Sequence, residues 1–356
     1  MSSRLPALFF CNALNMYGVK LSRSTVRMFG HNDMEHLERL LQQVHQADEK
    51  RGKKPILNRR FIVTEGLFAN TGTIAPLHQI VQLAHKCKFR TILDESCSFG
   101  TLGANGRGAI EHHGLKASDV DIICASMSNS LASIGGFCAG SMRVIDHQRL
   151  SSTGYCFSAS LPRFNAVSAS TGIEIMRREA STLFPKLHRN IKTMNSALTF
   201  AIAKANQSLK GRSITITLGG HEGSVLRHLR LEGHAMDHAQ LSRILAAAAD
   251  TAARRGVAVA AASYSPLDDT APAPSLRITC SCSISDHDVR APPPACIHRV
   301  LLKCDYWAGR AGGVCSCGKL SGSAFKLTMF FIFHELFVVV FSNLNAPRLG
   351  CSSRRF

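Results

Sequence analysis

The chain has 356 residues, 45% of them hydrophobic, so it can bury a full core and is expected to be globular rather than disordered. Its 42 Lys and Arg residues against 24 Asp and Glu give a formal net charge of +18. Such a charge is typical of proteins that bind nucleic acid or anionic membranes, but the basic residues are scattered and no aromatic residues are interleaved with them. We therefore predict a solvated basic surface and no nucleic-acid partner.

The chain contains 13 cysteines. It is too long for a small disulfide-rich domain, and its N-terminus lacks a basic region followed by an apolar run and a cleavage site. Cys87, Cys124, Cys138 and Cys156 lie inside apolar stretches, where cysteine behaves as a small hydrophobic residue. We therefore expect reduced thiols in a protein that faces the cytosol.

The first half of the sequence alternates between helical and strand patterns. Residues 34–45 place Leu37, Leu41 and Val44 on one helical face. The apolar run 60–64 is typical of a buried strand, and it is followed by a helix at 76–86 and by strands at 91–94 and 120–125. Apolar strands that alternate with helices predict an α/β fold with a mainly parallel sheet covered on both faces.

The second half has a different order of helical and strand patterns. Long helical patterns occupy residues 162–205. They are followed by strands at 213–217 and 225–231, an Ala-rich helix at 240–254, and strands at 257–262 and 275–282. This order predicts a smaller α+β domain. We expect part of a large domain in residues 1–180, the small domain in 181–285, and a tail without an assigned fold in 286–356.

The tail has one strongly apolar run, at residues 327–341. The run is short for a transmembrane helix, which needs about 20 residues, and it contains His334 and Glu335 near its centre. Four cysteines form two Cys-x-Cys pairs, Cys280 with Cys282 and Cys315 with Cys317. Zinc sites use wider spacing within each pair, so we predict neither a membrane span nor a metal site.

The residues that carry chemistry are expected at the carboxyl ends of the parallel strands, near Glu65, Asp94 and Ser126. Asp94 is followed by a loop with glycines at positions 100, 103, 106 and 108, and the next strand leads to hydroxyl residues and a Gly-Gly pair. A phosphorylated ring cofactor needs a carboxylate beside its pyridine nitrogen, hydroxyl and backbone N–H groups for its phosphate, and a lysine for a Schiff base.

These motifs resemble the α-oxoamine synthase family of pyridoxal-phosphate (PLP) enzymes, in which Asp-Glu-Ala-His-Ser precedes Gly-x-x-Gly-x-x-Gly-Arg-Gly and then a hydroxyl residue, Lys and Gly-Gly. The resemblance implies the aspartate-aminotransferase-like fold type I of PLP-dependent transferases. Asp94 matches the aspartate at the pyridine nitrogen, and Ser126 the hydroxyl position three residues before the lysine. Cys97 stands at the position of the ring-stacking histidine, Asn129 at that of the lysine, and Arg277 in the region of a carboxylate-binding arginine.

Two departures from the family pattern indicate the subtype. The Asn129 side chain has no nucleophilic amine, so it cannot form a Schiff base. Loss of both the lysine and the histidine resembles the non-catalytic first subunits of serine palmitoyltransferases. The resemblance is close over residues 15–161 and traceable to about residue 284, and the family's N-terminal membrane helix and first part of the large domain precede the matched region.

The resemblance implies a heterodimer with a lysine-bearing catalytic subunit that holds PLP covalently. The complex would condense L-serine with palmitoyl-CoA to 3-oxosphinganine in sphingolipid synthesis, on the cytosolic face of the endoplasmic reticulum membrane. Residues 94–108 and 129–136 would line the shared interface, and Asp94 and Ser126 would be degenerate cofactor contacts. No residue of this chain is then catalytic.

Two other hypotheses remain open on the sequence. The chain would be active alone if another lysine, Lys86 or Lys88, served the cofactor. It would otherwise be a binding module or a non-functional fragment that joins no transferase. Cys97 is interpreted as a packing residue, although His112 and His113 could approach it in space.

Overall fold

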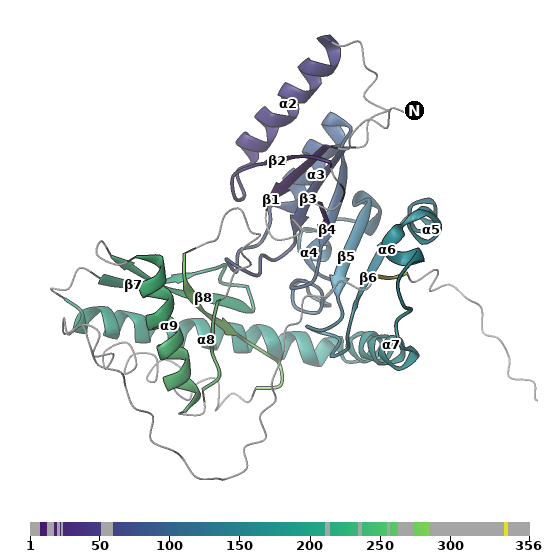
Figure 1. The fold of residues 1–356 in the computed structure, drawn as a ribbon. Helices are drawn as coiled ribbons and strands as arrows, with labels where there is room; N and C mark the ends of the chain where they lie inside the picture. Colours follow the sequence, from purple (N-terminus) through teal and green to yellow (C-terminus); the bar gives the residue numbers. More distant parts are fainter. Residues whose placement is uncertain are drawn as a thin grey trace, which may run out of the picture.

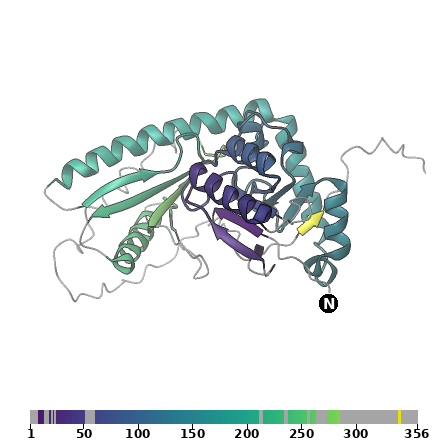
Figure 2. The same ribbon diagram turned by 90° about the horizontal axis from the view of Figure 1, so that it is seen from above.

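The computed structural model describes residues 8–12, 18–19, 22, 24–50, 60–210, 214–233, 237–254, 257–262, 273–284 and 338–340. In this part of the chain the strands form two sheets, one of seven strands and one of four. The long helix α8 (Ala180–Ser208) runs past the smaller sheet and reaches the larger one (Figures 1 and 2).

The larger sheet has the order β11-β6-β5-β4-β3-β1-β2. Its strands are β1 (Leu8–Asn12), β2 (Thr25–Met28), β3 (Arg60–Glu65), β4 (Arg90–Asp94), β5 (Ile122–Ser126), β6 (Gly136–Gly140) and β11 (Val338–Val340). The first five are mutually parallel, β6 is antiparallel to β5, and β11 pairs with β6 in parallel. The sheet is therefore mainly parallel, as predicted.

Helices α2 (Met34–Lys50) and α3 (Leu77–Cys87) pack together against β3. The apolar stripe of α2 buries Leu37 and Leu41 completely, and Ile80 of α3 and Ile62 of β3 meet it in the same cluster. Burial of each Leu or Ile side chain stabilises the fold by about 1.5–3 kcal/mol. Because the buried residues recur at helical spacing, this packing explains why α2 forms here. The predicted helix at 34–45 is confirmed, and it continues to Lys50.

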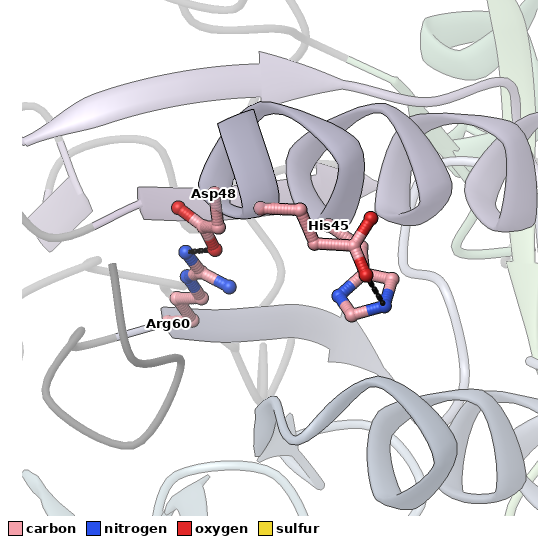
Figure 3. Close-up of polar contacts among 4 residues, drawn as sticks. His45, Asp48 and Arg60 are labelled. Atoms are coloured by element: carbon pink, nitrogen blue, oxygen red, sulfur yellow. Dashed lines mark hydrogen bonds and ion pairs between the residues drawn. The ribbon is translucent and has the colours of Figure 1, made fainter. Parts of the chain in front are cut away.

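A buried ion pair joins the end of α2 to the start of β3 (Figure 3). The Arg60 guanidinium contacts the Asp48 carboxylate, and it also lies over the Phe89 ring, 5.6 Å from the centroid. His45 Nε2 lies 3.4 Å from Glu49 Oε1, one helical turn along on the exposed side of α2. The buried pair links the last turn of α2 to the first residue of β3.

After β4 come the short helix α4 (Ala109–His112) and the 3-10 turn η2 (Ala117–Asp119). After β6 the chain passes through α5 (Met142–Ser151), α6 (Thr153–Cys156) and α7 (Arg163–Arg178) before α8. The predicted helical region at 162–205 is thus two helices, which break at Glu179.

The smaller sheet is antiparallel throughout and has the order β7-β8-β10-β9. Its strands are β7 (Ile214–Gly219), β8 (Leu226–Gly233), β9 (Ala260–Ala261) and β10 (Ser275–Thr279). Helix α9 (His238–Ala253) begins with a capping box, in which the Asp237 carboxylate accepts the Gln240 N–H at 2.7 Å and the Gln240 side chain accepts the Asp237 N–H.

One core cluster extends across both sheets. It contains Leu93 and Val120 of the larger part, Phe184 and Leu198 of α8, and Leu229 of the smaller sheet. The two parts are therefore held against each other by buried apolar surface along α8.

Four points of the sequence interpretation need correction or completion. The strand predicted at 257–262 is reduced to Ala260–Ala261, and that predicted at 275–282 ends at Thr279, because pairing with β8 stops there. Strand β6 was not predicted, since a run that begins and ends with glycine has low strand propensity. In the tail, Val338–Val340 forms β11, and the rest of 286–356 lies outside the described residues. The boundaries at 180 and 285 stay a prediction.

Among the described residues, no helix has the length and apolar character that a membrane span requires. The apolar run 327–341 lies outside the described residues, apart from its last part in β11. Cys315 and Cys317 also lie outside them.

Candidate functional site

The ends of β3, β4 and β5 lie at one edge of the larger sheet. Glu65 is paired with Asp94 across the β3–β4 ladder, and Asp94 with Cys124 across β4–β5, two residues before Ser126. The prediction that Glu65, Asp94 and Ser126 mark one edge of the sheet is therefore confirmed.

The Asp94 side chain is half-buried where β4 ends. Its Oδ1 accepts the N–H of Ser96 at 2.7 Å, which turns the chain sharply out of the strand. The Ser96 hydroxyl in turn accepts the N–H of Ser126 at 2.9 Å. Asp94 and Ser126, the two predicted cofactor contacts, thus lie on either side of Ser96.

Asn129 and Cys97, the two positions that depart from the family pattern, meet in space. The Asn129 Nδ2 donates to the backbone carbonyl of Ser96 at 2.7 Å and lies 3.9 Å from the Cys97 sulfur. The position beside residue 97 is therefore filled by an amide, which is neither nucleophilic nor basic. Asn129 is exposed, whereas its contact Cys97 is half-buried.

Burial raises the pKa of the Cys97 thiol to about 12, and the carboxylates of Glu65 and Asp94 act in the same direction. Arg277 of β10 has the opposite effect on this pKa, which places its charge within range of the site. Cys97 is therefore a neutral thiol at physiological pH and not a nucleophile. His113 does not approach it as a base, because its Nε2 lies 2.8 Å from the Ala75 carbonyl.

The Ser126 hydroxyl is engaged locally. Its Oγ lies 2.7 Å from the Ser128 Oγ and accepts the Ser128 N–H at 3.2 Å. Asn129 follows directly, so the hydroxyl pair stabilises the turn that presents the amide.

Glu95 organises the glycine-rich loop, a role that the sequence interpretation missed. Its buried carboxylate accepts the N–H groups of Ala109 at 2.9 Å and Ile110 at 3.2 Å, and it also contacts the Ser98 hydroxyl. Burial raises its pKa. A Cβ atom at Gly108 would lie 2.4 Å from Glu95 Oε2, so only glycine fits there. The sequence contains a signal for this role, because a glutamate directly follows Asp94 and precedes a loop with regularly spaced glycines.

The smaller sheet presents basic side chains toward this region. Arg277 is paired with His228 across the β8–β10 ladder, and the His228 Nε2 lies 3.1 Å from the Ala69 carbonyl in the loop after β3. Burial lowers the pKa of His228 and of His31, and the positive charge of Arg230, two residues along β8 from His228, lowers both further. Arg277 thus lies on the same face of the smaller sheet as His228, whose ring contacts the loop after β3.

The lysines of the alternative hypothesis lie elsewhere. Lys86, near the end of α3, is exposed and pairs with Glu38 at 2.7 Å. Lys88 caps α3 two residues before β4 begins, at the strand end opposite Asp94. The described site therefore has no amine in place to hold PLP covalently, and it does not fit a Schiff-base-bound cofactor.

A family model for aminotransferase class I and II matches residues 9–291. The chain belongs to the aminotransferase class I and II family. Members of this fold with solved structures include a serine palmitoyltransferase from Sphingomonas wittichii, with a TM-score of 0.60 and 24% identity over 84% of this chain and 68% of that one. An 8-amino-7-oxononanoate synthase from Francisella tularensis has a TM-score of 0.58 and 18% identity over 85% of this chain and 77% of that one. The predicted PLP-dependent transferase fold is thus confirmed.

Within the aminotransferase class I and II family, the chain is similar to first subunits. It is 39% identical to serine palmitoyltransferase 1 of Dictyostelium discoideum over 273 residues, which are 77% of this chain and 55% of that protein. It is 45% identical to long chain base biosynthesis protein 1 of Arabidopsis thaliana over 198 residues, or 56% of this chain and 38% of that protein. The chain spans about half the length of the first of these relatives and less of the second.

Proposed function

We propose that this chain is the non-catalytic subunit of a serine C-palmitoyltransferase, which condenses L-serine with palmitoyl-CoA to 3-oxosphinganine. The contact of Asn129 with Cys97 carries the proposal, because both positions that would act on a cofactor are held by unreactive side chains. The Asn129 amide donates to the Ser96 carbonyl and lies against the Cys97 sulfur. A lysine-bearing partner would hold PLP, and Asp94 and Ser126 would be remnants of a cofactor site. The complex would act on the cytosolic face of the endoplasmic reticulum membrane.

Exposed apolar side chains support association with such a partner. Among the described residues, most of the large exposed apolar side chains lie between residues 134 and 175, including Ile134, Phe157 and Phe164, which are 67%, 86% and 71% exposed. Exposed apolar groups that form one patch mark protein–protein contacts. In the proposed complex these side chains would contact the partner.

Incubation of the isolated chain with PLP, followed by borohydride reduction, tests whether any of its lysines forms a Schiff base. We expect no covalent label after reduction, because the described site has no lysine beside Asp94. A label on Lys86 or Lys88 would support the self-sufficient enzyme instead, and a trapped Schiff base of any kind would contradict the proposal.

Co-expression with a lysine-bearing serine palmitoyltransferase subunit tests whether this chain binds that subunit and is needed for its activity. We expect the two chains to co-purify and the pair to form 3-oxosphinganine, while neither chain is active alone. If a folded chain fails to associate, the binding-module or fragment hypothesis is correct.

A further inference from the structure

Strands β5 and β6 place two free cysteines opposite each other. Cys124 is the direct partner of Cys138 in the antiparallel ladder. Further along the same register, the N–H of Met127 donates to the Gly135 carbonyl at 2.8 Å, so 127 and 135 form a hydrogen-bonded pair. Hydrogen-bonded and non-hydrogen-bonded pairs alternate along an antiparallel ladder. Cys124 and Cys138, three positions away, therefore form a non-hydrogen-bonded pair, in which the side chains lie closest together.

This geometry suits a disulfide. Residues opposite each other at such a position have Cα atoms about 4.5 Å apart, and disulfides span Cα distances of about 4.4–6.8 Å. No movement of either strand is needed to bring the two sulfurs together.

The two thiols also interact. A hydrogen bond between them lowers the pKa of Cys138 and raises that of Cys124. The two sulfur atoms are therefore close enough to act on each other in the reduced chain.

We propose that Cys124 and Cys138 form a redox-responsive dithiol that closes to a disulfide when oxidised glutathione, or another small disulfide, accumulates. The Cys124 thiol, the more exposed of the two, loses its proton and attacks one sulfur of the oxidant. This step leaves a mixed disulfide and a small thiolate, which takes up a proton. Cys138 then loses its proton and attacks the Cys124 sulfur, so the second half of the oxidant leaves as a thiolate and takes up that proton. Two protein thiols are oxidised to one disulfide, and one small disulfide is reduced to two thiols.

Access to the pair comes from the Cys124 side. Cys124 is only partly buried, whereas Cys138 is 2% exposed. The bond would join the two ends of the segment 125–137, which contains Asn129 and Ile134. Oxidation would therefore stiffen the turn beside the candidate site, whether or not a partner binds there.

The test uses the purified full chain in glutathione buffers of increasing oxidised fraction, followed by acid quenching, alkylation and tryptic digestion. Residues 117–143 form a single tryptic peptide that holds Cys124 and Cys138 and no other cysteine. We expect this peptide to change from doubly alkylated to unalkylated with the loss of two hydrogens, and to revert on reduction. The proposal is overturned if the peptide stays doubly alkylated at ratios where the exposed Cys156 already carries glutathione.

One variant tests the order of attack. In Cys138→Ser the second thiol is missing, so Cys124 is expected to accumulate as a mixed disulfide with glutathione. The matched control Cys156→Ser should form the internal disulfide as the parent chain does. Alkylated Cys124 that carries no glutathione in folded Cys138→Ser would overturn its role as the attacking thiol. The parent chain tests the disulfide itself even if a variant fails to fold.

Discussion

His228 of β8 connects the two sheets through both of its ring nitrogens. The Ala69 carbonyl can only accept, so Nε2 carries the proton and donates across 3.1 Å, and Nδ1 accepts from the Ser275 hydroxyl at 2.9 Å. The side chain is fully buried, and burial lowers its pKa to about 4. The folded chain therefore holds a neutral imidazole at this junction.

We expect His228 to make the protein less stable in mild acid. The unfolded chain binds a proton on this residue near pH 6.5 and the folded chain only near pH 4, so the free energy of unfolding falls as the pH falls through this window, by roughly 3 kcal/mol at most. Urea unfolding between pH 4.5 and 7.5 measures the loss. His228→Gln should flatten the pH dependence, whereas the exposed control His45→Gln should not. Equal slopes for all three chains would contradict the assignment.

At the residue scale, the sequence predicted which residues lie in the site but not the contacts that they make with one another. The resemblance of the motifs to the α-oxoamine synthase family placed Asp94, Cys97 and Asn129 in one site. The contact between Asn129 and Cys97 depends on the turn at Ser96, and the link through His228 joins residues 159 positions apart, so neither has a local pattern in the sequence.

At the scale of elements, the glycine loop between β4 and α4 packs against α8. Gly106 has a φ of +69°, and a Cβ atom there would lie 2.0 Å from the buried Phe184 ring. A side chain at this position would meet both backbone strain and an aromatic ring that has no space to move.

We therefore expect Gly106→Ala to lower the free energy of unfolding by about 2–5 kcal/mol, the sum of a left-handed backbone penalty and overpacking. Gly114→Ala is the matched control, because Gly114 has a φ of +66° with no atom near its Cβ position, and it should cost only about 1–2 kcal/mol. Chemical denaturation measures both. Equal losses would show that the contact with Phe184 contributes nothing.

Strong periodicity made most elements predictable, and its absence explains the rest. The stripe of α2 and the apolar run of β3 identified both elements to within a few residues. Strand β6 depends on its pairing with β5, which brings a glycine-bounded segment into the ladder against its own preference. The reduction of β9 to Ala260–Ala261 likewise depends on how much of β10 is available for pairing.

On the scale of the whole molecule, exposed apolar side chains recur between residues 134 and 175, before β6 and along α5, α6 and α7. If this region binds a catalytic partner, the double variant Phe157→Asp with Phe164→Asp should lose co-purification and activity of the complex while the chain stays folded. Phe200→Asp is the control, because Phe200 is 73% exposed but lies on α8, outside the 134–175 region. Pull-down with the co-expressed partner measures the effect. Equal retention by both variants would place the contact elsewhere.

Strand β11 comes from the far end of the sequence and covers the outer edge of β6. A bare strand edge offers unpaired N–H and C=O groups on which strands of other molecules can add. We expect a chain shortened to end before Val338 to associate with itself at concentrations where the full chain does not, as measured by light scattering. Three residues of the tail would in that case protect the molecule against aggregation, a purpose unconnected with sphingolipid chemistry.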